Sequence, residues 1–310
     1  MKIIITGANG DIAISILKIL NKKFKKKAII HGSDIKLNHK GNYYFDKIIK
    51  VYPADCLKYL NQIKTFTKKY DLIIPTSEKE IKFISENIDK LNSHKILIHE
   101  KNIINNFLDK YKTFNFLKIN KMNEIGNCEI LKDVTAIKKF PSIVKTRFGA
   151  GNQNYIIINR KNDLKHLQLV KNQEYILQQY FDNEKEYTAC IYKNGNFTAI
   201  IIFDRILDKD KTFYGKIYNN NTIKKKLLNF AKIINLKGSI NLQFKLIKNK
   251  IFIFDVNPRL SSTVLMRHLV GFQDCYWWIT DFLKIKNLKK LYKKPKKNIV
   301  IRDETIKLYD

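Results

Sequence analysis

The chain has 310 residues, enough for two or three subdomains with a sizeable core, and its 45% hydrophobic content is typical of a globular protein. Its four cysteines are far apart, which argues against a disulfide framework and favours reduced thiols in a cytoplasmic protein. The net charge of +31 comes from lysines spread among abundant Asn and Ile, a composition that A/T-rich codons produce, so we do not expect nucleic acid as the partner. No apolar run approaches the roughly 20 residues of a membrane helix, so we expect no membrane partner; a homo-oligomer is compatible with the sequence.

The first third of the chain alternates strand and helix patterns. Residues 2–6 are an apolar strand, a glycine turn follows at 7–11, and Ile12, Ile16, Leu17 and Leu20 recur at helical spacing. Such alternation predicts a parallel, doubly wound sheet that ends near residue 107. The remaining elements expected here are strands at 28–34, 48–51, 71–75 and 95–98 and helices at 55–69 and 78–90.

The glycine turn also permits a dinucleotide interpretation. Thr6-Gly-Ala-Asn-Gly-Asp-Ile-Ala13 resembles the turn of short-chain dehydrogenases and sugar-nucleotide epimerases, and Asp34 follows about 20 residues later. Ala13 replaces the third glycine, however, and the Tyr-x-x-x-Lys that such enzymes need occurs too early, at Tyr43–Lys47. A structural strand–turn–helix is the preferred interpretation, and NAD(P) binding is kept as an alternative.

A second unit begins with a helix at 109–119 and a polar, irregular segment at 126–133. A strand at 141–146 then carries Lys145 near its end and leads into the glycine loop 147–153 and a strand at 155–158. This hairpin is not a P-loop, whose glycines open a helix. It can still cover phosphates with loop N–H groups and with the charges of Lys145 and Arg147.

The last part of the chain is expected to be a mixture of strands and helices. Asn194-Gly195 predicts a tight hairpin between strands at 187–193 and 196–203, with Arg205 just beyond it. Residues 284–297 form a lysine-rich tail, expected to be solvated. The other expected elements are helices at 162–169, 222–235 and 274–285 and strands at 174–181 and 298–302.

The stretch 237–259, which has the pattern of two strands joined by a tight turn, contains the strongest candidate site. Because side chains alternate along a strand, Asp255 and Asn257 share one face, and Phe252, Phe254 and Val256 are expected on the other. Gln243 joins Asp255 and Asn257 only if a bulge or an odd loop separates the strands, and we expect a three-residue loop that uses Asn249. One carboxylate with two amide oxygens suits Mg²⁺ carried by phosphates. A hairpin with a polar outer face is the alternative.

The order of these parts resembles the ATP-grasp superfamily, specifically its branch similar to the carbamoyl-phosphate synthase large subunit, over nearly the whole chain. The matching segments are Tyr70–Glu80, Asp109-Lys110, Phe140–Lys145 with Gly149-Ala-Gly151, Ile176–Phe181 with Glu186–Thr188, and Asp255-Val-Asn-Pro-Arg259 with Gln243 upstream. The resemblance implies a Rossmann-like parallel-sheet domain (1–107), followed by an α+β ATP-grasp fold made of a small lobe with the glycine loop (108–181) and a C-terminal lobe with the metal site (182–310).

The resemblance also implies roles for individual residues. ATP and Mg²⁺, as two ions, would bind between the lobes, with Gln243, Asp255 and Asn257 as metal ligands. Arg205 and Arg259 would neutralise the transferring phosphoryl group or the substrate carboxylate. The nucleotide would contact Lys110, Lys145, Gly149, Gly151, the hinge Gln179-Tyr180-Phe181 and Glu186. Gln179 stands where the family usually has Glu, and Asp255 is one methylene shorter than the usual Glu.

The expected function is an ATP- and Mg²⁺-dependent, ADP-forming ligase. It would activate a small-molecule carboxylate as an acyl phosphate and join it to an amine or ammonia. Two alternatives remain: an NAD(P)-dependent sugar-nucleotide epimerase or reductase that uses the glycine turn, and a non-catalytic basic binding protein. The second alternative predicts nucleic-acid affinity that falls steeply with salt.

Overall fold

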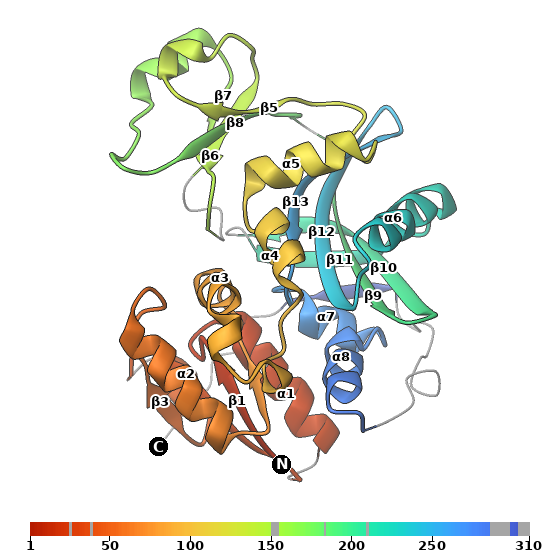
Figure 1. Cartoon of the computed structure of the whole chain (residues 1–310). Coiled ribbons are helices and arrows are strands. Elements are labelled where there is room, and N and C mark those ends of the chain that lie inside the picture. Colours follow the sequence, from red (N-terminus) through yellow and green to blue (C-terminus); the bar gives the residue numbers. More distant parts are fainter. Residues whose placement is uncertain are drawn as a thin grey trace.

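The computed structural model describes residues 1–24, 27–37, 40–149, 155–182, 184–208, 211–285 and 298–302. Three sheets follow one another along the chain and form an N-terminal domain, a small lobe and a C-terminal lobe (Figure 1). This architecture confirms the expected fold class, a parallel-sheet domain followed by two α+β lobes. The exact boundaries at residues 107 and 181 remain predictions.

The N-terminal sheet is parallel, with strand order β3-β2-β1-β4. Ile3, Ile4 and Ile5 of β1 are completely buried, as expected for a strand covered on both faces. The expected strand at 95–98 forms only an isolated bridge from Ile96 to Ile73, so that prediction was wrong. The elements are β1 (Lys2–Thr6), α1 (Asp11–Phe24), β2 (Ile29–Asp34), β3 (Ile48–Lys50), α2 (Leu57–Lys69), β4 (Leu72–Ile74), α3 (Glu78–Glu86) and α4 (Lys101–Phe107).

The small lobe is an antiparallel sheet of order β5-β8-β6-β7 with a hydrophobic core of its own. Its edge strand β5 (Cys128–Leu131) was missed because Glu129 and Ile130 are both exposed and the segment shows no alternation. The helix expected at 162–169 is a short 3₁₀ helix, Lys161–His166, in which the Asp163 carboxylate accepts from two preceding backbone N–H groups. The other strands are β6 (Ser142–Thr146), β7 (Tyr155–Ile158) and β8 (Tyr175–Gln179).

The C-terminal lobe is a six-stranded antiparallel sheet of order β13-β12-β9-β10-β11-β14. Strand β10 is longer than expected, so Arg205 lies inside it rather than beyond it, and β11 was missed. β11 was hard to predict because it contains Gly215, a residue uncommon inside strands. A glycine is present there because the strand passes close to the ring of Phe203. The elements are β9 (Glu186–Asn194), β10 (Phe197–Asp208), β11 (Lys211–Ile217), α6 (Asn221–Ile233), β12 (Gly238–Ile247), β13 (Lys250–Asn257), α7 (Val264–Leu269), α8 (Asp274–Phe282) and β14 (Ile299–Ile301).

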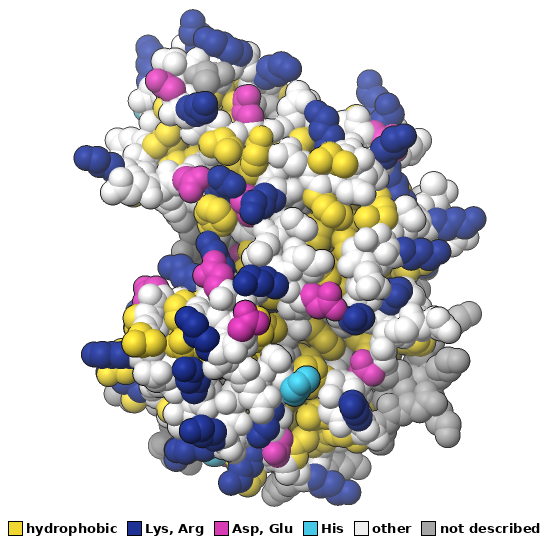
Figure 2. Space-filling model, in the orientation of Figure 1, with side chains coloured by type: hydrophobic (Ala, Val, Ile, Leu, Met, Phe, Trp, Pro, Cys, Tyr) yellow, Lys and Arg dark blue, Asp and Glu magenta, His cyan; other side chains and the backbone are white. Residues whose placement is uncertain are grey.

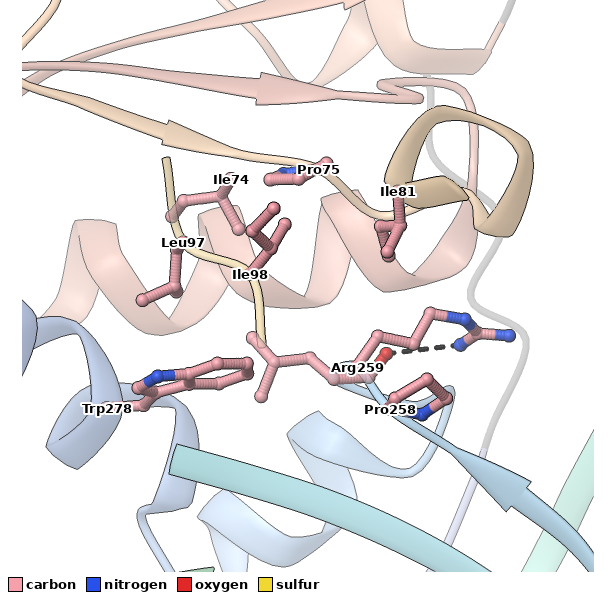
Figure 3. Close-up of a pocket in the computed structure, with 9 residues that line it drawn as sticks. Ile74, Pro75, Ile81, Leu97, Ile98, Pro258, Arg259 and Trp278 are labelled. Atoms are coloured by element: carbon pink, nitrogen blue, oxygen red, sulfur yellow. Dashed lines mark hydrogen bonds between the residues drawn. The ribbon is translucent and has the colours of Figure 1, made fainter. Parts of the chain in front are cut away.

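The N-terminal domain and the C-terminal lobe share one core. Residues of β1 and α1 belong to the same buried cluster as Tyr192, Trp277 and Trp278 of the C-terminal lobe. Helix α5 (Lys110–Ile119) covers the start of β13, and Leu117 is completely buried there. At the joint, Ile74, Leu97 and Ile98 face Leu260 and Trp278 around a void of about 10 Å³ (Figure 3). The two parts are therefore packed as one unit, and the small lobe carries a separate core.

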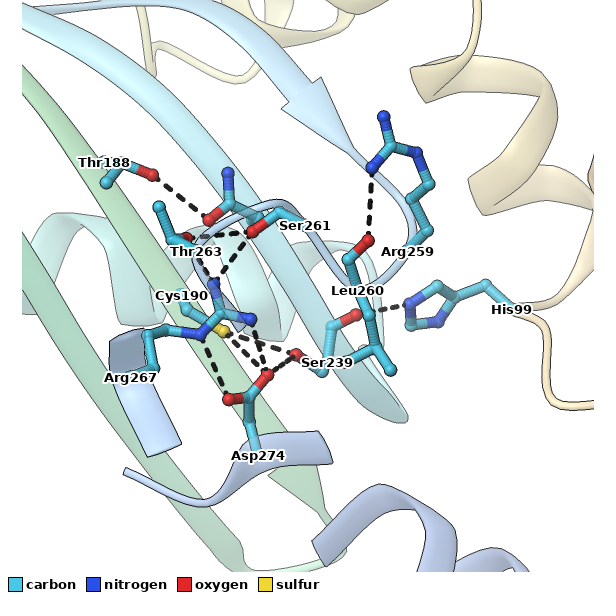
Figure 4. A network of polar contacts seen from close by, with 11 residues as sticks. His99, Thr188, Cys190, Ser239, Arg259, Leu260, Ser261, Thr263, Arg267 and Asp274 are labelled. Atoms are coloured by element: carbon cyan, nitrogen blue, oxygen red, sulfur yellow. Dashed lines mark hydrogen bonds and ion pairs between the residues drawn. The ribbon is translucent and has the colours of Figure 1, made fainter. Parts of the chain in front are cut away.

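A buried polar network lies behind this joint (Figure 4). Arg267 of α7 forms a two-bond ion pair with Asp274 of α8, at 3.0 and 2.9 Å, and both side chains are completely or almost completely buried. The same guanidinium donates to the hydroxyls of Ser261 and Thr263, at 2.8 and 2.6 Å. Arg267 therefore fixes the loop that follows β13, a loop that also carries Arg259.

Lysine and arginine side chains are scattered over the visible face rather than gathered in one patch (Figure 2). That face is hollowed between the small lobe above and the N-terminal domain below. No helix among the described residues is long and apolar enough to span a membrane.

Candidate functional site

A cavity of about 440 Å³ lies among the small lobe, the C-terminal lobe and the N-terminal domain. It brings together all of the site residues that the family resemblance implies and that the structure describes. Gly151, the remaining one, lies outside the described residues. The predicted residues that line the cavity are Lys110, Lys145, Gly149, Gln179, Tyr180, Phe181, Glu186, Arg205, Gln243, Asp255, Asn257 and Arg259.

Three lysine ammonium groups in this cavity are held by backbone carbonyl oxygens. Lys110 Nζ donates to Gly149 O at 2.6 Å, Lys145 Nζ donates to Phe254 O at 3.2 Å, and Lys245 Nζ donates to Phe181 O at 2.6 Å. A carbonyl orients an ammonium group without cancelling its charge. The lining side chains therefore present a strong excess of positive charge, as a site for a polyanion requires.

The ammonium of Lys145 is shielded from solvent in the cavity wall. Burial lowers its pKa to about 8; Asp255 opposes that shift, and Lys110 adds to it by like-charge repulsion. β6 places Lys145 between β8 and β7, where it faces the floor formed by β13. An incoming phosphate would favour the charged ammonium and thereby raise the pKa again.

Arg205 lies beside two other predicted site residues. Because β10, β9 and β12 are neighbours in the sheet, its guanidinium reaches the Glu186 carboxylate, with which it forms an ion pair, and donates to Gln243 Oε1 at 2.9 Å. The Arg205 side chain is only 7% exposed. The guanidinium is therefore fixed in the cavity wall, and part of the Glu186 carboxylate is already engaged.

A bulge in the β12–β13 hairpin brings Gln243 and Asp255 to the same face of the sheet. The turn has two residues, Lys248 and Asn249, both with positive φ, so the expectation of a three-residue loop was wrong. Gln243 pairs with Asp255 and Phe244 with Ile253, which leaves Phe254 as the extra residue. The bulge therefore puts Gln243 and Asp255 on the cavity face, as the parity argument required.

The same bulge corrects a second expectation about this strand. Phe252 and Phe254 were expected on the face opposite Asp255, together with Val256. Both rings line the cavity instead, and Val256 alone of the three joins the core beneath the sheet. The extra residue at position 254 shifts the alternation of side chains by one. Phe252, before the bulge, therefore lies on the same face as Asp255 and Asn257, after it.

Asp255 and Asn257 form a pair of oxygen donors suited to Mg²⁺. Asn257 Nδ2 donates to Asp255 Oδ2 at 2.6 Å, which fixes the orientation of the carboxamide and leaves its oxygen for another partner. The described residues contain no cluster of three or more His, Cys, Asp or Glu that could hold a metal by itself. These two residues therefore fit an ion that also takes oxygens from phosphate and water.

Arg147 contributes to the structure of the site rather than to its lining. Its guanidinium binds the Asp109 carboxylate through two nitrogens, at 2.7 to 3.0 Å, and pairs with Glu174 at 2.8 Å. The carboxylate of Asp109 also caps α5 by accepting from the backbone N–H groups of Tyr111 and Lys112. The predicted role of Arg147 as a phosphate charge is thus not supported; it ties the end of β6 to α5.

The N-terminal domain contributes to the far end of the cavity. Glu78, at the start of α3, pairs with Arg259 at 2.8 Å, and Ile12 of α1 lies in the lining. Asp34, the acid of the dinucleotide interpretation, accepts a hydrogen bond from the Asn9 backbone N–H at 3.0 Å and so closes the glycine turn itself. No contact among the described residues of this domain favours the NAD(P) alternative.

Sequence reasoning missed several lining residues. Lys245 could have been predicted to line the site, because it lies two residues beyond Gln243 and therefore on the same face of the strand. The others reach the cavity only through the tertiary arrangement, and no comparable spacing predicts them; they include Ile12, Glu78, Lys211, Ser261 and Ser262.

Known proteins resemble this chain in sequence and in fold. Residues 171–305 match the family described as ATP-grasp in the biosynthetic pathway with Ter operon. An uncharacterized protein of Mycoplasma genitalium is 25% identical over 218 residues, 70% of this chain and 60% of that protein. A D-alanine–D-alanine ligase of Pelagibacter ubique is 28% identical over 209 residues, 62% of this chain and 64% of that protein. The matches thus span less than two thirds of either relative.

Solved structures show the same fold. N5-carboxyaminoimidazole synthetase from Staphylococcus aureus, complexed with ADP, has a TM-score of 0.72 at 19% identity, covering 90% of this chain and 77% of that one. An L-amino acid ligase from Bacillus licheniformis has a TM-score of 0.73 at 13% identity, covering 95% and 77%. The carbamoyl-phosphate synthase-like branch remains a prediction. The family match over residues 171–305, the relatives and the fold all indicate the ATP-grasp superfamily as the wider group.

Proposed function

We propose that this protein is an ADP-forming ligase that uses ATP and Mg²⁺ to join a carboxylate to an amine or ammonia. The main support for the proposal is the set of charged and polar groups in the cavity. Its three lysine ammonium groups are held by carbonyl oxygens, beside a carboxylate–carboxamide pair suited to Mg²⁺. Phosphoryl transfer depends chiefly on positioning and charge neutralisation, which these groups supply.

The nucleotide would lie between the small lobe and the C-terminal lobe. Lys145 and Lys110 would contact phosphate oxygens, and Gly149 and Gly151 would allow the loop backbone to approach them. Tyr180, Phe181 and the backbone near Gln179 would hold the base, while the Glu186 oxygen not engaged by Arg205 would accept from a ribose hydroxyl. A synthetase of the same fold has been solved in complex with ADP, which supports an adenine nucleotide as the ligand to test.

The carboxylate substrate would bind near Arg259, where Ser262 also lines the cavity; the neighbouring Ser261 hydroxyl is already engaged by Arg267 and Thr263. An oxygen of the substrate carboxylate attacks the γ-phosphorus as the bond from that phosphorus to ADP breaks and ADP leaves. The neutral amine nitrogen then attacks the acyl carbon, the bond to the phosphate oxygen breaks, and the proton lost by the amine passes to the departing phosphate. Bound Mg²⁺ would neutralise phosphate charge during the first step. Arg259 orients the carboxylate, and Arg205 offers a fixed positive charge to the transferred group. The names of the relatives, a D-alanine–D-alanine ligase and an L-amino acid ligase, suggest amino acids as the first substrates to test.

The test is a screen for ADP formation with Mg-ATP, candidate carboxylates and amines. Lys145→Ala and Asp255→Asn should each lower turnover by about a hundredfold or more, the usual loss when one charge-stabilising group is removed. Lys225→Ala, which removes an exposed lysine on α6, should have no effect. Failure of the wild-type protein to bind any adenine nucleotide would disprove the proposal.

A further inference from the structure

Gln243 is an amide in the wall of a cavity where a carboxylate would hold a metal ion more firmly. Its Oε1 already accepts a hydrogen bond from Arg205 Nη2 at 2.9 Å. The same nitrogen is ion-paired with Glu186, and Arg205 also lies within 3.4 Å of Thr212 Oγ1. The guanidinium is thus held from three sides with Gln243 as one of its supports.

This arrangement is unfavourable for a metal ion at Gln243. Magnesium binds oxygen at roughly 2.1 Å, so an ion on Gln243 Oε1 would lie within roughly 5 Å of the guanidinium nitrogen that donates to that oxygen. Arg205 cannot lose its proton to relieve the repulsion. Gln243, being neutral, does not offset it, and the Glu186 carboxylate already pairs with Arg205.

The charge balance of the whole cavity also disfavours a second metal ion. Among the described lining residues, three carboxylates (Glu78, Glu186 and Asp255) face six cationic side chains. Two of these carboxylates, Glu78 and Glu186, are paired with arginines, which leaves Asp255 for an ion. The cationic side chains are Lys110, Lys145, Arg205, Lys211, Lys245 and Arg259. Lys211 pairs at 2.6 Å with Asp11, a carboxylate outside the lining, so five cations face the three lining carboxylates without such an outside partner.

We propose that the site uses one divalent cation, held by Asp255 and Asn257 together with phosphate oxygens. Arg205 supplies, beside Gln243, the positive charge that a second ion would provide. Gln243 is then a positioning residue for Arg205 instead of a metal ligand, contrary to the role expected from the sequence. This inference rests on the proposed nucleotide-binding function and deepens it.

The experiment counts bound Mn²⁺ by electron paramagnetic resonance in protein saturated with β,γ-imido-ATP, which is not hydrolysed. Wild-type protein should bind one Mn²⁺ per bound nucleotide, and a count of two overturns the proposal. Gln243→Glu should raise the count to two, because a carboxylate at this position offsets Arg205. A count that stays at one in this variant also overturns the assigned role of Gln243.

Matched controls separate this inference from the function on which it rests. Gln168→Glu makes the same chemical change at an exposed residue of the small lobe and should keep the count at one. Nucleotide binding is measured in the same samples by calorimetry. Two Mn²⁺ with bound nucleotide refutes only the single-ion proposal, whereas absence of nucleotide binding refutes the ligase function and this inference with it. The wild-type count requires no substitution, so it decides the proposal even if a variant fails to fold.

Discussion

The ammonium of Lys145 lies 3.2 Å from the backbone carbonyl of Phe254, the residue that the bulge adds to β13. The bulge that orients Asp255 thus also provides the acceptor for the buried lysine. The cation and the candidate metal ligand are therefore set by one local feature of the backbone. A change in the register of β12 and β13 would disturb both at once.

Nucleotide affinity should fall as the pH rises through about 8. Burial lowers the pKa of Lys145 to about 8 in the free protein, and bound phosphates favour its charged form. Above this pH, binding must take up a proton, and affinity is lost by up to about tenfold per pH unit. Below it the lysine is already charged and the affinity should be flat. Calorimetry in buffers of different ionisation enthalpy measures the uptake. Lys145→Arg stays charged and should abolish this dependence; an unchanged slope would contradict the assignment.

Arg259→Ala should impair use of the carboxylate substrate while leaving nucleotide affinity unchanged. Arg259 lines the end of the cavity near Ser261 and pairs with Glu78. We expect kcat/KM for the carboxylate to fall by about a hundredfold. Glu78→Gln removes the competing carboxylate and should lower the KM for that substrate. Steady-state kinetics with each substrate varied in turn tests both changes. An equal loss of nucleotide affinity in Arg259→Ala would argue against this assignment.

Gly238→Ala should destabilise the fold strongly. Gly238, at the start of β12, has φ +102°, and a Cβ there would lie 2.4 Å from Trp278. We expect the free energy of unfolding to fall by about 2 kcal/mol or more, from overpacking and backbone strain together. Gly195→Ala is the matched control, because Gly195 also has positive φ, +54°, with nothing within 4 Å. In Gly195→Ala the free energy of unfolding should fall by only about 1 kcal/mol, the cost of placing a non-glycine residue at positive φ. Urea unfolding of both variants makes the comparison, and equal losses would exclude the Trp278 contact as the cause.

Arg267→Met should lower the free energy of unfolding by about 3–5 kcal/mol, because it leaves the Asp274 carboxylate buried without its partner. The double variant Arg267→Met/Asp274→Leu should recover much of this loss, since it removes both buried charges. Denaturant unfolding of the single and double variants forms the test. Strictly additive losses would show that the pair does not act as a unit.

The sequence was sufficient for the fold class and for the candidate nucleotide and metal residues, which line the cavity wherever the structure describes them. Runs such as Ile3–Ile5 identify buried parallel strands by composition alone. Short motifs such as Asp255-Val-Asn-Pro-Arg259 identify candidate ligands, because residue type and spacing limit the chemistry. Short and irregular elements were less predictable: β5 has no alternation, and β11 has a glycine where packing is tight.

Only the tertiary structure decided which groups meet. The sequence required an odd loop or a bulge between β12 and β13, and folding placed the extra residue at Phe254. Arg205 and Gln243 are brought together by strand neighbours that are distant in sequence, and Glu78 reaches Arg259 from another domain. The spacing of hydrophobic residues in the sequence predicts which face of a helix or strand is buried. Which elements pair, and in what register, depends on tertiary packing that a local sequence pattern does not determine. The same reason explains why the choice of an arginine over a second metal ion at Gln243 became visible only in the folded chain.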